Sequence, residues 1–238
     1  MVEPPNQYPY ARPPRGPSRL STVLPKHAPE YSLWLGGSLG VLGYAGALYI
    51  NDAAPPPGNS GIETTGNFIR PGLALQGDVG VRLARRYIPY LALEVGLVGA
   101  GRRFDGTSTN ASTSFIGLGF RYLAGDVDSV SFASDLSFGF RKFEVSNATG
   151  TWSAAGIEIF RLGFGADVRL STRATISPML TISGGQLTDT SGTIQFAPNQ
   201  SDMQSPPFTG NSGIPASDQE TYFAIVLGCG VHVDLLGN

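Results

Sequence analysis

Few residues in this sequence can do acid–base or nucleophilic chemistry. The chain has two histidines, His27 and His232, and a single cysteine, Cys229. His232 lies two residues before Asp234, which would put both side chains on one face of a strand, and a His–Asp pair is part of the hydrolase triad. The lone cysteine excludes an internal disulfide and a cysteine-rich zinc site. We predict no catalytic residue, no metal site and no cofactor, and we expect His232 to be an interior hydrogen-bond partner.

A larger group of charged residues shares one pattern. Each lies in a segment where apolar residues alternate with small or charged ones, and each falls on the small, polar face. If that face is enclosed, its charges have to pair, because an isolated buried charge is costly. We therefore predict a structural ion-pair network, with a proton or ion path as the alternative. Its members, including the His–Asp pair, are Asp78, Arg82, Glu94, Arg121, Asp135, Arg141, Arg161, Asp167, Arg169, His232 and Asp234.

The segments that carry these charges have a period of two, which is typical of β-strands. Their apolar faces extend over about ten residues, the length that a tilted strand needs to cross a membrane. Lysine occurs only at Lys26 and Lys142, whereas soluble β-proteins spread lysines over exposed strand faces. We therefore expect the apolar face to contact lipid and the small face to line an interior. The predicted strands are 31–43, 72–83, 87–99, 114–122, 129–141, 158–170, 172–184 and 221–236.

The segment 31–50 allows a second interpretation. It contains no charged residue and has about the length of a membrane-spanning helix, and Gly36 and Gly40 have the GxxxG spacing of paired helices. However, each of its glycines costs a helix about 1 kcal/mol relative to alanine, and 31–43 alternates with period two, with Trp34 as the large exception. Seven strands cannot close an antiparallel barrel with both ends on one side. We therefore predict that 31–43 is the first of eight strands.

The lengths of the connections support a barrel. Short connections are expected near 84–86, 124–128 and 171–173, and long ones at 44–70, 101–112, 142–155 and 186–220. Alternation of long and short connections is typical of outer-membrane barrels, which have short periplasmic turns and long outer loops. The predicted fold class is all-β: an eight-stranded antiparallel up-and-down transmembrane β-barrel.

The pattern over 31–236 resembles the eight-stranded outer-membrane barrels of the OmpA and OmpX type. This resemblance implies a location in the bacterial outer membrane and a role as an anchor, an adhesion or defence surface or, occasionally, a lipid-modifying enzyme. Two features depart from the family. The chain ends on Gly237 and Asn238 rather than on an aromatic residue, and Pro178 lies in mid-strand, where it removes a ladder hydrogen bond. We expect a bulge or a shortened strand there. We also expect Glu158 to lie on the lipid side near the outer rim, where its carboxylate reaches water.

The first 30 residues differ from the rest of the chain. They are rich in proline and lack the apolar stretch and cleavage site of a signal peptide, so we predict a disordered or extended arm at 1–30 before the barrel at 31–236.

The sequence favours a non-enzymatic barrel that anchors and presents surface loops, with its interior plugged by the ion-pair network. The alternatives are a lipid-modifying enzyme, which needs a His/Ser/acid group at the outer rim, a narrow ion-conducting pore, and a soluble lipocalin-like barrel. We expect outer-membrane lipid as the surrounding partner, a possible surface partner at 186–220, where Phe196 and Phe208 lie, and a monomer. The net charge of −2 provides no basic surface for nucleic acid.

Overall fold

The computed structural model describes residues 27–50, 61–198 and 205–237. The arm predicted at 1–30 therefore lies mostly outside the described residues. Among those described, no helix is long and apolar enough to cross a membrane.

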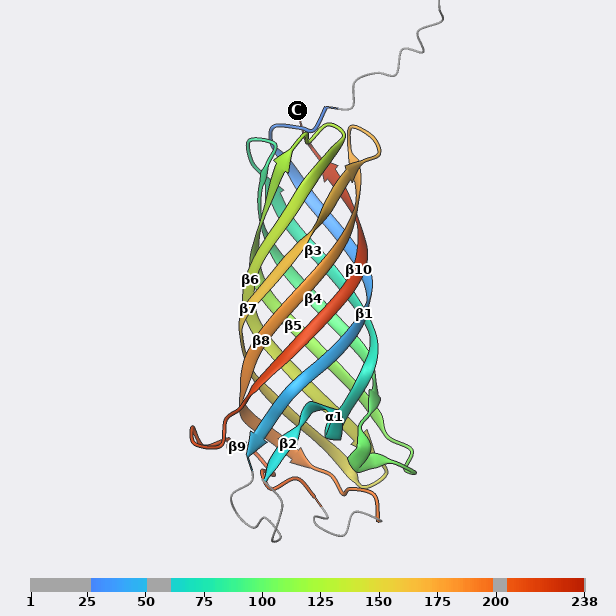
Figure 1. The fold of residues 1–238 in the computed structure, drawn as a ribbon, viewed down its shortest axis with the longest axis vertical. Helices are drawn as coiled ribbons and strands as arrows, with labels where there is room; N and C mark the ends of the chain where they lie inside the picture. The colour runs from blue at the N-terminus through green and yellow to red at the C-terminus, as the bar shows by residue number, and fades with distance from the viewer. Residues whose placement is uncertain (1–26, 51–60, 199–204, 238) are drawn as a thin grey trace, which may run out of the picture.

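Eight long antiparallel strands form a closed barrel (Figure 1). Each pairs with its sequence neighbour, and β10 pairs with both β8 and β1, which closes the ring. Two short strands, β2 (Ile62–Thr64) and β9 (Ser212–Gly213), pair with β1 and β8. The barrel strands are β1 (Ser32–Ile50), β3 (Ile69–Arg82), β4 (Tyr87–Ala100), β5 (Asn110–Gly125), β6 (Val130–Asn147), β7 (Gly150–Arg169), β8 (Ala174–Thr193) and β10 (Thr221–Leu235).

This architecture confirms the predicted fold class. The helical interpretation of 31–50 is wrong, because the segment is a strand from Ser32 onward and pairs with β3 and β10 along its length. Trp34, the exception to the apolar alternation, points inward and is buried. A large aromatic ring in the interior therefore explains the irregularity in the pattern.

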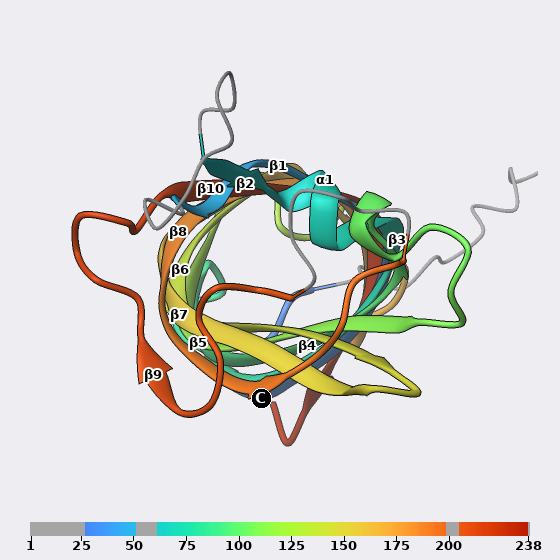
Figure 2. The same ribbon diagram turned by 90° about the horizontal axis from the view of Figure 1, so that it is seen from below.

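The two ends of the barrel differ. At the turn end, β1 begins, β10 ends, and short turns join β3 to β4, β5 to β6 and β7 to β8 (Figure 1). At the loop end lie the longer connections, with the short helix α1 (Thr65–Phe68) and the 3-10 turn η1 (Arg102–Phe104) at the mouth (Figure 2). Both ends of the barrel domain are thus on one side, as eight strands require.

The outer surface of the barrel is apolar. Along β3, for example, Leu73, Leu75 and Val79 are exposed while Ala74 and Asp78 between them are buried. Exposed large apolar side chains recur in the same way on all eight barrel strands. Soluble monomers rarely expose so large a contiguous apolar surface, so this surface is suited to contact with lipid.

One of the long connections predicted from the sequence is wrong. Strands β6 and β7 continue as a paired hairpin up to Asn147 and Gly150, so 142–155 is not a long loop. The Asn147 side chain closes the turn by accepting from the backbone N–H and the hydroxyl of Thr149, at 2.8 and 2.6 Å. The apolar alternation stops at Phe140 because a strand that leaves the membrane no longer needs an apolar outer face.

The expectation for Pro178 is also wrong. Strand β8 runs through this residue with neither a bulge nor a shortening, and Pro178 faces Cys229 of β10 in unbroken register. On the other side, β7 pairs at Gly165 and again at Val168 in the same register, with the pairing interrupted between them. The missing N–H is therefore accommodated by a local gap on the β7 side.

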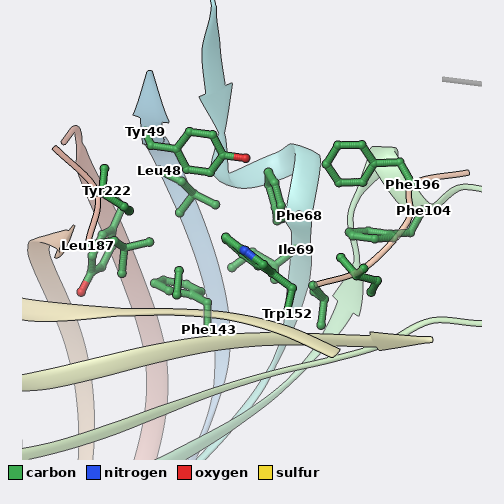
Figure 3. Close-up of a cluster of buried hydrophobic side chains, with 14 residues drawn as sticks. Leu48, Tyr49, Phe68, Ile69, Phe104, Phe143, Trp152, Leu187, Phe196 and Tyr222 are labelled. Atoms are coloured by element: carbon green, nitrogen blue, oxygen red, sulfur yellow. The ribbon is translucent and has the colours of Figure 1, made fainter. Parts of the chain in front are cut away.

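A cluster of buried apolar side chains fills the loop end (Figure 3). This loop-end cluster is built mainly from aromatic rings in edge-to-face contact, such as Tyr49 against Phe68 at 5.9 Å and Phe104 against Phe196 at 5.5 Å. Trp152 lies at its centre and donates from Nε1 to the carbonyl of Phe208 at 2.8 Å. Its members are Leu48, Tyr49, Phe68, Ile69, Phe104, Phe143, Val145, Trp152, Ala154, Leu187, Ile194, Phe196, Ile214 and Tyr222.

Candidate functional site in the barrel interior

All eleven residues predicted to form the interior network point into the barrel. Ten of them are buried, and the eleventh, Asp135, has a side chain that is 12% exposed. The period-two alternation of each strand places them there, because successive side chains point to opposite faces. They form three layers along the barrel axis.

The layer nearest the loop end joins four strands. Arg141 of β6 donates to Glu94 of β4 at 3.0 Å and forms an ion pair with Glu158 of β7. Arg161 forms an ion pair with Glu94 and donates to the side-chain oxygen of Gln76 at 2.7 Å. Two carboxylates thus face two guanidinium groups, and each carboxylate contacts both of them.

Two tyrosines complete this layer. Tyr44 accepts from Arg141 at 2.8 Å and donates to Thr113 at 2.9 Å. Tyr222 donates to Glu158 at 3.4 Å. Because Tyr222 also belongs to the loop-end cluster, this charged layer is in direct contact with that cluster.

Glu158 corrects the sequence prediction. It was expected on the lipid side, but its side chain is fully buried in the interior. A β-bulge causes the change: the register of β7 shifts by one residue between Glu158 and Phe160 against β8, and at the matching place against β6. The bulge keeps Ile157 and Ile159 exposed while both Glu158 and Arg161 point inward.

The middle layer contains one guanidinium group and several carboxylates. Arg121 donates from Nε and Nη2 to the two oxygens of Asp135, both at 2.7 Å. His232 Nε2 lies 3.4 Å from Nη1 of Arg121 and 3.8 Å from Oδ2 of Asp78. A cavity of about 40 Å³ adjoins these groups, which is large enough and polar enough to hold water.

The layer nearest the turn end is centred on Asp234. Its carboxylate accepts from Arg82 Nε at 2.8 Å, from Arg169 Nη2 at 3.2 Å and from the Ser32 hydroxyl at 2.7 Å. Asp234 is thus engaged by residues other than His232. The His–Asp spacing in the sequence does not form a catalytic pair, because the two side chains serve different layers.

Three residues that carry interior interactions were missed from the sequence. Ser177 bonds to Asp167 and His232, Gln76 bonds to Arg161 and Asp78, and Trp34 stacks on His232 with ring centroids 4.3 Å apart. Ser177 and Gln76 lie on the small face of the period-two alternation, so their positions in the sequence already indicated that they face the interior. Nothing in their identity singled them out from other interior polar residues.

At the turn end, the residues just before β1 are held against the turn between β5 and β6. Asp128 accepts from the Ala28 N–H at 2.8 Å and from His27 Nδ1 at 3.0 Å, and it forms an ion pair with Arg85. Burial alone would raise the pKa of Asp128, but hydrogen bonds from Arg85, Ala28 and His27 outweigh it and hold the pKa well below its usual range. We call this set of contacts the turn-end clasp.

Solved structures with a similar fold are outer-membrane barrels. Neisserial surface protein A superposes with a TM-score of 0.54 at 9% identity, covering 86% of this chain and 99% of that one. The outer membrane protein OprG from Pseudomonas aeruginosa superposes with a TM-score of 0.50 at 11% identity, covering 87% and 98%. No protein-family model matches the sequence, and no curated protein matches it. The chain therefore has the fold of eight-stranded outer-membrane barrels.

Proposed function

We propose that this protein is a non-enzymatic barrel of the bacterial outer membrane that anchors a folded surface at its loop end. The observation that carries the proposal is the filled interior: three layers of charged side chains, held by ion pairs and hydrogen bonds, adjoin the loop-end cluster. An interior packed in this way is suited to rigidity rather than to transport. The apolar outer surface supports a position in lipid, and the likeness to outer-membrane barrels supports the choice of membrane.

An enzymatic role has less support. The lipid-modifying alternative needs a histidine near the loop end, whereas the two histidines of the sequence are His27, at the turn end, and His232, in the middle layer. Ser177 and His232 are both buried in the interior, where a lipid or peptide substrate has no room beside them.

The surface partner proposed for 186–220 has to use residues other than its two phenylalanines. Phe196 belongs to the loop-end cluster, and Phe208 packs against it. A partner would contact the outer side of this connection, around β9, where Ser191 and Asn211 are exposed.

Three measurements test the proposal together: gel migration, protease cleavage in intact cells and membrane fractionation. A folded membrane barrel should migrate differently on a detergent gel before and after boiling, and protease added to intact cells should cut within 199–213 before it cuts the turn at Arg85 and Arg86. The first result separates the barrel from a soluble fold. Cleavage at the arginine turn in intact cells would reverse the proposed orientation, and absence of the protein from the outer-membrane fraction would reject the localisation.

A further inference from the structure

The imidazole ring of His232 is closely packed in the interior. The ring stacks on Trp34 with an interplanar angle of 13°. A Cβ atom at Gly36 would lie 2.1 Å from the ring, and one at Gly230 would lie 3.0 Å from it. The ring therefore occupies space that both glycines leave open, and it has little freedom to turn.

Hydrogen-bond chemistry fixes which ring nitrogen carries the proton. The Ser177 hydroxyl lies 2.5 Å from Oδ1 of Asp167 and 3.1 Å from Nδ1 of His232. A carboxylate only accepts and a hydroxyl has one hydrogen, so Ser177 donates to Asp167. Its oxygen is then an acceptor toward the ring, which means that Nδ1 of His232 carries a hydrogen.

Nε2 of the same ring faces two groups of opposite character. In the neutral ring Nε2 is an acceptor, and Arg121 Nη1 can donate to it from 3.4 Å. In the doubly protonated ring it is a donor, and Asp78 Oδ2 can accept from 3.8 Å. The site thus contains a partner for Nε2 in each protonation state.

The charges of the middle layer favour an additional proton. Three carboxylates from different strands lie around the ring: Asp78 on β3 is 3.8 Å from it, Asp167 on β7 reaches it through Ser177, and Asp135 on β6 lines the same cavity. Arg121 on β5 is their guanidinium partner, and it is engaged by both oxygens of Asp135. Asp78 and Asp167 instead bond to the neutral side chains of Gln76 and Ser177. Glu94 and Arg161 also line this cavity and form an ion pair with each other.

Water can deliver the proton. The cavity of about 40 Å³ is lined by Asp78, Ser177 and His232, so a water molecule in it can lie next to Nε2. Transfer of a proton from hydronium to Nε2 leaves neutral water in the cavity and an imidazolium ring at His232, with no other bond broken.

We propose that His232 is a proton-binding site in the middle of the barrel, in which a proton taken up at Nε2 links the ring to Asp78 while Nδ1 remains bonded through Ser177 to Asp167. The bound proton supplies the positive charge that the middle layer lacks. Trp34 and the two glycines hold the ring in the one orientation that serves both carboxylates.

The test uses nitrogen-15 NMR of labelled histidine in the full-length barrel in detergent micelles. A His27→Gln background leaves His232 as the only histidine, and His27 is exposed and lies at the turn end. At about pH 8 we expect a neutral ring with its hydrogen on Nδ1, and on acidification toward about pH 4 we expect protonation at Nε2 with the barrel still folded. This first test needs no substitution in the interior. A hydrogen on Nε2 at pH 8, or a ring that stays neutral down to pH 4, would overturn the proposal.

Two interior variants and a control extend the test. Ser177→Ala should remove the preference for hydrogen on Nδ1. Asp78→Asn should move the titration midpoint of His232 to lower pH by about one unit, a tenfold weaker hold on the proton, because an opposite charge is lost. Ser38 lines the same cavity but does not bond to the ring. Ser38→Ala should therefore change neither the nitrogen that carries the hydrogen nor the titration midpoint. An unchanged midpoint in folded Asp78→Asn would reject Asp78 as the partner of the bound proton.

Discussion

At the scale of single residues, Glu158 shows how a bulge decides whether a charge faces lipid or protein. Its carboxylate contacts both Arg141 and Arg161, and all three side chains are buried. Two guanidinium groups so enclosed need the carboxylate, because removing one partner of a buried ion pair leaves an uncompensated charge.

We predict that Glu158→Leu destabilises the barrel. A lipid-facing glutamate would give the opposite result, because leucine is favoured against hydrocarbon. The expected loss is about 3 kcal/mol in the free energy of unfolding, or less if water reaches the site, measured by urea titration of the folded gel band in detergent. Ile159→Leu, at the exposed neighbouring position, is the control and should change stability little. A Glu158→Leu barrel as stable as the wild type would contradict the interior position.

Asp135 allows the same logic to be applied to the middle layer. Its two oxygens accept from Arg121 in a bidentate pair, and Arg121 also lies 5.0 Å from the ring of Trp34. We predict that Asp135→Ala lowers the unfolding midpoint in the same assay, because Arg121 loses its bidentate partner. Leu136→Val is the control, because Leu136 is the next residue along β6 and is exposed. Equal midpoints for the two variants would show that Arg121 does not depend on this pair.

At the scale of elements, the turn-end clasp connects the start of β1 to two turns. Ala84 and Arg85 adopt positive φ angles of 46° and 66°, the left-handed conformation used in tight hairpins. This conformation aims Arg85 at the carbonyl of Ala28 and at Asp128, and the Arg85 N–H donates to the carbonyl of Glu30 at 3.1 Å. The conformational cost of two non-glycine residues in this region is thus offset by contacts that order the chain ahead of β1.

We predict that the contribution of Asp128 to the clasp does not change with pH above about pH 4. The pKa of Asp128 is lower in the folded state than the ordinary value of about 3.9, so its contribution is present above that value and is lost as the pH falls through the folded pKa. Hydrogen exchange at the Ala28 amide, corrected for the intrinsic rate, should therefore be equally slow at pH 7 and pH 5. Asp128→Ala should accelerate it, and Asp126→Ala, in the same turn, should not. Loss of protection in the wild type between these pH values would show that another group controls the clasp.

The elements also show where sequence reasoning succeeds and where it stops. Alternation located all eight barrel strands because lipid on one face and a packed interior on the other impose opposite residue types. It failed at the ends of β6 and β7, where both faces leave the membrane, and at the β7 bulge, where one extra residue inverts the phase for Glu158. The partners within each layer were also beyond reach, because they come from strands far apart in the sequence, such as β3 and β10 around His232.

At the scale of the whole molecule, the interior changes character along the barrel axis. A second apolar cluster begins at the turn end with Ala28 and Val127 and extends along the interior to Trp34 and Phe115, and the loop-end cluster fills the other end. This second cluster packs alongside the charged layers: Trp34 stacks on His232, and the Arg161 guanidinium carbon lies 4.9 Å from the Phe115 ring centroid. The cavity of about 40 Å³ lies at the middle layer. Charges buried among apolar side chains are partly removed from water, which strengthens their mutual attraction.

This arrangement predicts that the wild-type protein gives no steady single-channel conductance in planar bilayers. A small barrel filled by side chains has no continuous water column, and an ion moving along the axis would have to separate the Glu94–Arg141 and Glu94–Arg161 pairs. Truncation of the loop-end cluster by Trp152→Ala should leave the bilayer silent as well, because the charged layers remain in place. The informative contrast is Glu94→Gln, which weakens the ion pairs of the layer nearest the loop end and should destabilise the fold without creating a channel. A reproducible wild-type conductance that Glu94→Gln abolishes, with stability unchanged, would instead identify the interior as a narrow ion path.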